Sequence, residues 1–375
     1  MHISHLDLLN FRVYEKLSFS PDRRMNILFG KNAQGKTSIL EAIYLLATSR
    51  SWRAGKDSEM IHWGAEQARV FAGIIREEQN DVDVEVILNR SEKKQVSVNT
   101  IRQTKLADLM GKINVVLIEP HDVDIVRGDP STRRKFLNLE ISQIQPQYCI
   151  LMANYRKVLD QRNRLLREMM HSGHTNGVLN VLNEQLVSYG SRIIERRLAF
   201  LNNIASIAGV IHSQITEGGE TLEIKYSTSM DISVTDRELT IEDFAERFRN
   251  RLEEVRSEEI RRGVTLAGPQ RDDIIFTVNG IDARVYGSQG QQRSIALSLR
   301  LAELDVMEES AQEAPIVLLD DVMTDLDEDR RAHVFEMTWG RCQTFITAAS
   351  RRSFDQEFIT GSRIFDVSKG KVTVE

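Results

Sequence analysis

The sequence predicts an α/β fold whose main lobe is split in the chain by a mainly helical insertion. Residues 30–37 form a Gly-x-x-x-x-Gly-Lys-Thr loop after an apolar strand, and residues 315–321 form a second apolar strand that ends in two aspartates. Between them, residues 121–262 carry long charged segments with apolar residues every three or four positions, as in helices. Because the loop and the aspartates serve the same kind of phosphate site, the chain ends must fold together. We therefore expect one lobe from residues 1–120 and 263–375, and a helical domain from residues 121–262.

The loop near the N-terminus is typical of a nucleotide phosphate site. Residues 25–29 precede it as a buried strand would, and residues 38–46 follow at helical spacing. The backbone N–H groups and the helix N-terminus would face the phosphates, while Lys36 reaches the β and γ oxygens and Thr37 offers its hydroxyl to Mg²⁺. A glycine turn with a surface lysine is the alternative, which both flanks disfavour. The predicted nucleotide-binding residues are Gly30, Lys31, Asn32, Ala33, Gln34, Gly35, Lys36, Thr37 and Ser38.

The apolar run at residues 315–321 is a candidate Walker B strand. Its apolar residues would bring Asp320 to the carboxyl end of a strand, beside the phosphate loop and its Mg²⁺. We interpret Asp320 as the magnesium-side carboxylate, together with Thr37, and Asp321 as the general base for the attacking water. A buried strand that ends in helix-capping aspartates is the alternative. The chain is thus expected to be an ATPase that uses ATP and Mg²⁺, with Asp321, Asp320 and Lys36 as catalytic residues.

Composition points to an ordinary soluble protein, with 28% charged and 41% hydrophobic residues. No apolar run approaches the roughly 20 residues of a membrane span, and the first residues lack the pattern of a secretory signal. We expect a cytoplasmic location and no membrane partner. Cys149 and Cys342 fit no metal or redox spacing. A formal net charge of -6 argues against a uniformly basic nucleic-acid binder, yet leaves room for a local patch.

The first 120 residues are expected to form mostly strands. Residues 3–12 predict an edge or hairpin strand, and residues 69–76, 82–89 and 95–101 predict an antiparallel meander. Residues 114–118 supply a further apolar strand, which closes this part of the lobe.

The middle of the chain is expected to form a helical hairpin. Residues 145–171 and 178–216 have helical spacing, and the polar linker 172–177 lies between them. A short strand at residues 222–227 and a helix at residues 241–262 complete this section.

Beyond residue 263 the β pattern returns. Residues 274–278 and 283–286 predict two strands around an Asn-Gly turn at residues 279–280. A strong helical pattern at residues 291–308 then leads to the Walker B strand.

Residues 286–293, Tyr-Gly-Ser-Gln-Gly-Gln-Gln-Arg, look like the signature loop of ABC-type ATPases, and the motifs follow the same order. With the Asn-Phe-Arg run at residues 10–12 and the Gly-Pro-Gln-Arg-Asp-Asp run at residues 268–273, the chain resembles the RecF family over essentially its full length. That family of bacterial recombination mediators is related to the SMC proteins. The resemblance implies an ABC/SMC-type P-loop ATPase head, split in sequence, with an inserted helical domain.

In the families that the chain resembles, the signature loop contacts the γ-phosphate held by a second subunit. The resemblance therefore implies a two-fold homodimer that forms with ATP, in which each nucleotide lies between Lys36 of one chain and Ser288 of the other. Arg12 resembles an arginine that SMC-like ATPases place near the nucleotide or the dimer interface. The alternatives are a glycine loop that caps an ordinary helix and an exposed arginine after a strand. The signature residues expected at the nucleotide are Ser288, Gln289, Gly290 and Gln291.

Some positions depart from the family pattern. The wider ABC class usually has Glu at the position of Asp321, whereas RecF-like proteins have Asp, and the shorter side chain predicts slow turnover. The loop at residues 324–327 is Thr-Asp-Leu-Asp where the family has Ser-Glu-Leu-Asp. The switch histidine of ABC transporters is missing from residues 345–350, and Gln270 stands where the family usually has His. Glu119 is the candidate for the Q-loop glutamine.

Residues 127–168 carry nine basic and four acidic side chains in an otherwise acidic protein. Such a patch could neutralise several phosphates, in a salt-dependent and largely sequence-independent way. From charge alone, a solvated helix face with intrahelical ion pairs is equally open; the resemblance favours DNA. No aromatic ladder accompanies the patch, which favours duplex backbone contact over base stacking. The candidate DNA contacts are Arg127, Arg133, Arg134, Lys135, Arg156 and Arg164.

We therefore expect an ATP-dependent DNA clamp that closes on ATP and opens on hydrolysis. The resemblance implies a role in recombinational repair at single-strand gaps, in which the protein acts with RecR and RecO to help load RecA and links repair to replication and the SOS response. One alternative is a nucleotide-gated SMC-like scaffold that binds proteins rather than DNA. Another is the ATPase subunit of a different ABC-type assembly, such as a transporter or a nuclease, which would carry a switch histidine or an extra acidic metal cluster.

Overall fold

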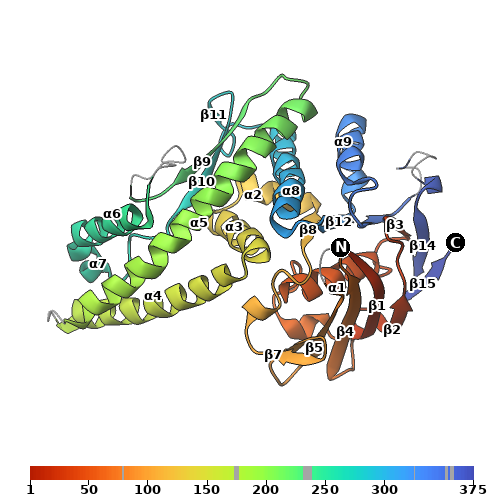
Figure 1. The fold of residues 1–375 in the computed structure, drawn as a ribbon, viewed down its shortest axis with the longest axis horizontal. Helices are drawn as coiled ribbons and strands as arrows, with labels where there is room; N and C mark the ends of the chain where they lie inside the picture. The colour runs from red at the N-terminus through yellow and green to blue at the C-terminus, as the bar shows by residue number, and fades with distance from the viewer. Residues whose placement is uncertain (78–79, 173–176, 231–238, 325, 351–353, 355–358) are drawn as a thin grey trace. The chain divides into compact units, whose positions relative to one another are not determined.

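The computed structural model describes residues 1–77, 80–172, 177–230, 239–324, 326–350, 354 and 359–375, which form two compact units (Figure 1). Unit 1 contains Met1–Asp122 and Leu297–Glu375, and unit 2 contains Val123–Ala296. Unit 1 is therefore built from both ends of the chain. The predicted second boundary lay at residue 262, whereas residues 263–296 lie in unit 2.

The first sheet of unit 1 is antiparallel, with the strand order β2-β1-β4-β5-β6-β7. The predicted meander is confirmed, although residues 95–101 form two strands rather than one. The chain reverses at Asn99 and Thr100, which both have left-handed backbone angles (φ 48° and 66°). The strands are β1 (His2–Phe11), β2 (Tyr14–Phe19), β4 (Gln67–Ile75), β5 (Val82–Asn89), β6 (Gln95–Val98) and β7 (Ile101–Gln103).

The second sheet of unit 1 has the order β15-β14-β3-β13-β12-β8 and is parallel except for β15. Strands β3 and β13 are buried along their whole length, as expected for parallel strands covered on both faces. Parallel pairing aligns the carboxyl ends of β3, β8, β12 and β13 at one edge of the sheet. The strands are β3 (Met25–Phe29), β8 (Val115–Ile118), β12 (Ile316–Asp320), β13 (Thr344–Ala348), β14 (Arg363–Ser368) and β15 (Lys371–Val374).

Helices complete unit 1. The predicted helix after the phosphate loop is confirmed as α1 (Lys36–Thr48), which is buried at all but one of its positions. The Walker B strand is followed by α9 (Glu328–Thr338), which Asp327 caps. The short 3₁₀ helices are η1 (Asp57–Met60), η2 (Leu106–Asp108), η3 (Pro120–Asp122) and η4 (Val322–Thr324).

Unit 2 is mainly helical with a small antiparallel sheet of order β11-β10-β9. Its strands β9 (Leu222–Ser227) and β10 (Asp273–Val278) pair along their full length, which places β10 in this unit rather than in unit 1. The helices are α2 (Val123–Arg127), α3 (Pro130–Ile144), α4 (Gln147–Ser172), α5 (Val178–Ile215), α6 (Ile241–Glu254) and α7 (Arg256–Arg262), and α8 (Gln289–Ala311) begins here and continues into unit 1.

Three predictions for this part of the chain were incomplete or wrong. Helix α3 was missed; it ends at Ile144, and its C-cap Gln145 directly precedes Pro146. The predicted helix at residues 241–262 is broken at Val255, which has φ −90° and ψ 0°. Residues 283–286 form no strand, because β11 (Ile281–Asp282) already ends the pairing after the Asn-Gly turn.

The long helices α4 and α5 pack against each other (Figure 1). Residues 173–176 of the linker predicted between them lie outside the described residues. By length and composition alone, α5 is the one helix among the described residues that could cross a membrane. A core helix of a soluble protein passes the same test, and 44% of the apolar stretch of α5 is buried inside the protein.

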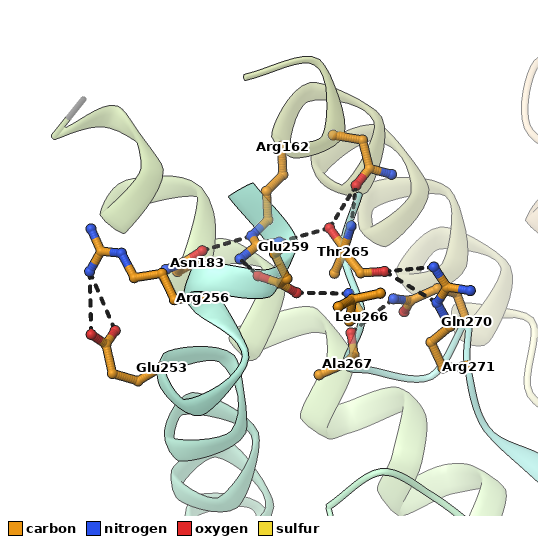
Figure 2. Close-up of polar contacts among 11 residues, drawn as sticks. Arg162, Asn183, Glu253, Arg256, Glu259, Thr265, Leu266, Ala267, Gln270 and Arg271 are labelled. Carbon is orange, nitrogen blue, oxygen red and sulfur yellow. Dashed lines mark hydrogen bonds and ion pairs between the residues drawn. The ribbon is translucent and has the colours of Figure 1, made fainter. Parts of the chain in front are cut away.

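A buried arginine joins α4 to α5, α7 and the segment that follows α7 (Figure 2). The Arg162 guanidinium donates to the carboxylate of Glu259 on α7 (2.6 Å), to the amide oxygen of Asn183 on α5 (2.7 Å) and to the Thr265 hydroxyl (2.8 Å). The second carboxylate oxygen of Glu259 accepts from the backbone N–H of Leu266 at 2.8 Å. The ion pair is almost fully shielded from water, since its two side chains are 1% and 0% exposed.

We expect Arg162→Ala to lower the free energy of unfolding by about 3–5 kcal/mol, because it leaves the Glu259 carboxylate buried without its partner. Urea denaturation followed by circular dichroism measures the change. Arg164→Ala on the same helix is the control; Arg164 is exposed, and its loss should change stability by less than about 0.5 kcal/mol. Equal losses from both variants would contradict this account.

Candidate functional site

The loop at residues 30–35 turns β3 into α1 within a tightly packed environment. A Cβ on Gly30 would lie 2.2 Å from the carbonyl oxygen of Val367 on β14, so glycine alone fits at that position. At the other end of the loop, the Tyr14 hydroxyl donates to the Gly35 carbonyl at 3.1 Å. Gly35 is the N-cap of α1, and among the described residues no side chain caps the helix there, which leaves the N–H groups of Lys36 and Thr37 for an anion.

Lys36 and Thr37, the first two residues of α1, make polar contacts within the site. The Lys36 ammonium is buried and donates to the carbonyls of Gly30 (2.7 Å) and Lys31 (3.2 Å), so it lies over its own loop. The Thr37 hydroxyl donates to the Asp320 carboxylate at 2.8 Å, although the two residues are 283 positions apart in the chain. The structure thus brings together the two residues predicted to hold Mg²⁺.

A second threonine, which the sequence reasoning missed, fixes both aspartates. The Thr347 hydroxyl on β13 donates to the Asp320 carboxylate at 2.9 Å and accepts from the backbone N–H of Asp321 at 2.8 Å. Asp321 has a left-handed backbone (φ 51°), which is uncommon for a residue other than glycine. The parallel register of β12 and β13, which pairs Asp320 with Thr347, was a signal that strand prediction alone could not supply.

A cleft of ≈ 1100 Å³ opens in front of the loop, and all of its lining residues belong to unit 1. Residues 32–38 and Asp321 line it, together with several cationic side chains. Residues 32–38 of the predicted loop therefore share one cavity with the second Walker B aspartate, whereas Gly30 and Lys31 are not among its described lining residues. Positive charge around such a cavity favours a phosphorylated ligand. The cations in the lining are Arg12, Lys36, Arg53, Arg90 and Lys369.

Arg12 lines the cleft, but its guanidinium is already engaged with the protein. It contacts both oxygens of Glu41 on α1, at 2.7 and 2.5 Å, and donates to the Glu59 carbonyl at 2.7 Å. The Glu41 side chain is fully buried and also accepts from the Ser51 hydroxyl at 2.5 Å. The structure therefore shows Arg12 as an anchor between the turn after β1 and α1, at the edge of the cleft.

Glu119 follows β8, the strand beside β12, and lies next to Asp320 at the same sheet edge. Burial raises the pKa of Glu119 from 4.5 to about 7; the negative charges of Asp122 and Asp320 act in the same direction, and Arg300 opposes them. Burial also raises the pKa of Asp320, against the hydrogen bonds from Thr37 and Thr347. Glu119 and Asp320 are therefore two neighbouring carboxylates whose ionised forms are costly without a cation beside them.

The raised pKa of Glu119 predicts how stability depends on pH in metal-free buffer. Since the folded pKa lies above the unfolded one, this group lowers the free energy of unfolding as pH rises from about 4.5 to 7, and the loss is complete above pH 7. Glu119→Gln removes that ionisation. We expect it to raise Tm by several degrees at pH 8 and to leave Tm almost unchanged at pH 5, as measured by differential scanning calorimetry with EDTA.

The control for this prediction is Glu66→Gln, at an exposed glutamate of the same unit. It should leave the pH dependence of Tm unchanged. A Glu119→Gln variant with the same pH profile as the wild type would show that Glu119 ionises normally in the folded protein.

The signature residues lie in unit 2 and form a reciprocal helix cap. The Ser288 hydroxyl accepts from the backbone N–H of Gln291 (3.1 Å), and the Gln291 side chain accepts from the N–H of Ser288 (2.8 Å). The Gln291 amide also donates to Glu220 at 2.8 Å. Ser288, Gln289 and Gly290 are exposed, so the cap leaves them accessible to a ligand or another chain.

The remaining motif positions that the structure describes make hydrogen bonds within their own units. Asp327 accepts from the N–H of Arg330 at 3.0 Å and begins α9, whereas Asp325 lies outside the described residues. The segment expected to carry a switch histidine contains β13 and supplies Thr347 to the site instead. Gln270 accepts a hydrogen bond from the buried Tyr155 hydroxyl inside unit 2.

The structure removes Arg133 from the candidate DNA contacts. Its side chain is 1% exposed, pairs with both oxygens of Asp273 (2.6 and 3.0 Å) and donates to the Gly128 carbonyl at 2.8 Å. Arg134 is half-buried and donates to the Asp272 carbonyl at 2.8 Å, and burial lowers its pKa. A guanidinium held in this way is not available to a phosphate.

Four of the six candidates remain on the surface. Lys135 on α3 and Arg156 and Arg164 on α4 are exposed. Arg127 is also exposed and forms an ion pair with Asp124, three residues earlier, at 2.8 Å. The candidate DNA surface is therefore Arg127, Lys135, Arg156 and Arg164.

The site residues fit a magnesium ion of the kind that phosphate sites use. The described residues contain no group of three or more His, Cys, Asp or Glu side chains able to hold a metal ion. Mg²⁺, however, keeps several waters and needs only one or two protein oxygens plus those of the phosphates. The hydroxyl of Thr37 and the carboxylate of Asp320, 2.8 Å apart, supply that donor set.

The fold and the site define an SMC-like α/β protein of the ABC ATPase class. Residues 2–373 match the family described as RecF/RecN/SMC N terminal domain. The solved Smc head bound to the C-winged helix domain of ScpA has the same fold, with a TM-score of 0.55 at 14% identity over 100% of this chain and 97% of that chain. The predicted fold class is therefore confirmed.

Within that class, the chain belongs to the RecF family. It is 39% identical to the "DNA replication and repair protein RecF" of Oceanobacillus iheyensis, over 99% of this chain and 100% of that protein. It is 40% identical to the RecF of Halothermothrix orenii, over 100% and 99%. A solved structure of the "recombination mediator protein RecF-ATP in RecFOR pathway" has a TM-score of 0.91 at 31% identity, over 100% and 97%.

Proposed function

We propose that this protein is an ATPase that acts as an ATP-dependent DNA clamp in replication and recombinational repair. The observation that carries the proposal is the hydrogen bond from Thr37 to Asp320, which joins the phosphate loop to the Walker B strand. The relatives named as DNA replication and repair proteins, and the RecF structures described with ATP, support this assignment.

In this proposal Lys36 leaves the carbonyls of Gly30 and Lys31 and binds the β- and γ-phosphate oxygens. Mg²⁺ held by Thr37 and Asp320 would neutralise the charge that develops on the transferred phosphate. Asp321, whose backbone is fixed by Thr347, orients the attacking water. Because the side chain of Asp321 is short, it positions the water less well than a glutamate would, and we expect slow turnover. Arg12 holds the edge of the cleft in place through its contact with Glu41.

The biological setting that we propose is a cytoplasmic role at single-strand gaps. Since RecF structures are described within the RecFOR pathway, we propose RecO and RecR as partners and the loading of RecA as the outcome. We further propose that unit 1 carries the phosphate loop and Walker B residues of one chain, and that the Ser288 loop of a second chain completes each nucleotide site.

The mass of the protein in solution tests whether two chains enclose the nucleotides. We expect a monomer without nucleotide and with ADP, and a dimer with a slowly hydrolysed ATP analogue and Mg²⁺, by light scattering after size exclusion. Ser288→Arg should abolish the dimer, because it puts bulk and a cation where the γ-phosphate of the partner would bind. The variant should still bind ADP, whose site lies in unit 1.

Thr240→Arg is the matched control for this experiment. Thr240 caps α6 with a capping box of the same kind, in the same unit but outside the signature loop. Both variants lose about 1 kcal/mol of cap stability, and only Ser288→Arg should lose the dimer. A mass that never changes with nucleotide would refute the clamp mechanism.

Charge reversal at the exposed basic residues of unit 2 tests whether this surface binds DNA. We expect the triple variant Lys135→Glu, Arg156→Glu and Arg164→Glu to weaken duplex DNA binding at least tenfold. It should also reduce the slope of log K against log salt by roughly 0.9 for each phosphate that the protein no longer neutralises. Fluorescence anisotropy with a gapped duplex, at several salt concentrations, measures both quantities.

The control reverses Lys16 on β2, Lys93 in the loop between β5 and β6, and Arg102 on β7, which are exposed in unit 1 and change the net charge equally. It should keep its DNA affinity. If the unit 2 triple variant binds DNA as the wild type does while it still binds ATP, a nucleotide-gated scaffold for protein partners becomes the better description.

A further inference from the structure

An exposed tryptophan stands at the rim of the cleft that contains the phosphate loop. Trp63 lines the same cavity as Lys36 and Thr37. Its side chain is 84% exposed, more than any other large hydrophobic side chain among the described residues. A large aromatic ring left in water beside a binding cavity is available for a ligand.

The backbone presents this ring on a tight turn. Residues 62–65 form a β-turn in which the N–H of Ala65 donates to the His62 carbonyl at 3.1 Å. Gly64 occupies the third position with φ +86°, the conformation that a type II turn requires and that glycine adopts readily. Trp63 therefore occupies the second position, at the tip of the turn.

Hydrogen bonds to two other elements hold the turn in place. The His62 N–H donates to the Asn10 carbonyl (2.8 Å), and the His62 Nδ1–H donates to the Arg12 carbonyl (2.7 Å). Arg90, just beyond β5, donates through Nε to the Ala65 carbonyl at 2.8 Å. The indole is thus exposed, yet its backbone is fixed from both sides, so little ordering cost remains when a ligand binds.

The cavity itself indicates what the ring would contact. One part is lined by residues 32–38, whose backbone and Lys36 suit phosphates, and the cationic side chains lie around it. Trp63 is the single Phe, Tyr or Trp among the lining residues that the structure describes. A ligand that carries phosphates at one end and a flat aromatic group at the other matches this division, and a nucleotide is such a ligand.

We propose that Trp63 is the platform on which the base of the bound nucleotide stacks. The proposal rests on the proposed function, since it requires that the phosphate loop hold the phosphates of the same molecule. Trp63 is then a binding residue for the base: it sets the affinity for the nucleoside part and leaves the affinity for the phosphate part unchanged. Every base has an aromatic face, so the platform favours nucleotides over bare polyphosphate without choosing among bases.

The test compares ADP with inorganic tripolyphosphate by isothermal titration calorimetry, in the presence of Mg²⁺. ADP is the appropriate nucleotide because it lacks the γ-phosphate through which a second chain would bind. We expect Trp63→Leu to weaken ADP binding about tenfold, which is about 1.4 kcal/mol, and to leave tripolyphosphate binding unchanged. Trp63→Phe, which keeps an aromatic face, should recover most of the ADP affinity.

Trp339→Leu is the matched control. Trp339 is another exposed tryptophan of unit 1 and does not line the cleft. Its loss should leave both affinities unchanged. The chain has 3 tryptophans, so fluorescence provides a second readout. ADP should quench the emission of the Trp339→Leu variant and have little effect on that of Trp63→Phe.

Three results would overturn the proposal, each in a distinguishable way. If Trp63→Leu binds ADP as Trp339→Leu does, while Lys36→Ala binds neither ligand, the proposed function stands and the base platform is refuted. If Trp63→Leu impairs only the dimer formed with an ATP analogue, Trp63 contacts a second copy of the chain instead. If the wild type binds neither ADP nor tripolyphosphate, the proposed function fails and the base platform fails with it.

Discussion

The hydrogen bond between Thr37 and Asp320 depends on the register of four parallel strands. Strands β3, β13, β12 and β8 are consecutive in the sheet, and their carboxyl ends meet at one edge. A slip of one residue in β12 would turn Asp320 to the other face of the sheet, away from the phosphate loop. Because all of unit 2 lies between β8 and β12 in the chain, register rather than sequence proximity holds the site together.

The sequence predicted β3, β8 and β12 of this sheet, because short apolar runs bounded by glycine, proline or aspartate are characteristic of buried strands. It also placed Lys36, Thr37 and Asp320 correctly relative to those strands. It did not predict β13, β14 and β15. It could not identify Thr347, since a threonine inside an apolar strand has no special pattern until the neighbouring strand is known. The pairing of Arg12 with Glu41 was hidden for the same reason, because it joins two elements whose packing only the fold determines.

The basic segment of unit 2 shows what charge counting omits. Arg133 and Lys135 are two residues apart on α3, yet one is buried against Asp273 and the other is exposed. Helical periodicity contained the signal, because the buried Phe136, Leu137 and Ile141 follow Arg133 at intervals of three, four and eight residues. A residue on that apolar stripe belongs to the core whatever its charge, and its charge then needs a partner there.

The sheet edge of unit 1 that carries the predicted nucleotide site combines features that lower the free energy of unfolding. Burial raises the pKa of both Glu119 and Asp320, the charge of Asp320 raises that of Glu119 further, and Asp321 has a left-handed backbone. A fold selected for stability alone would replace such groups. They are tolerable where a cation binds, because a ligand that binds only the folded state stabilises it by the free energy of binding. In the proposed site, the carboxylates that destabilise this edge without a cation would increase its affinity for one, so that nucleotide binding and the stability of unit 1 would be linked through the same side chains.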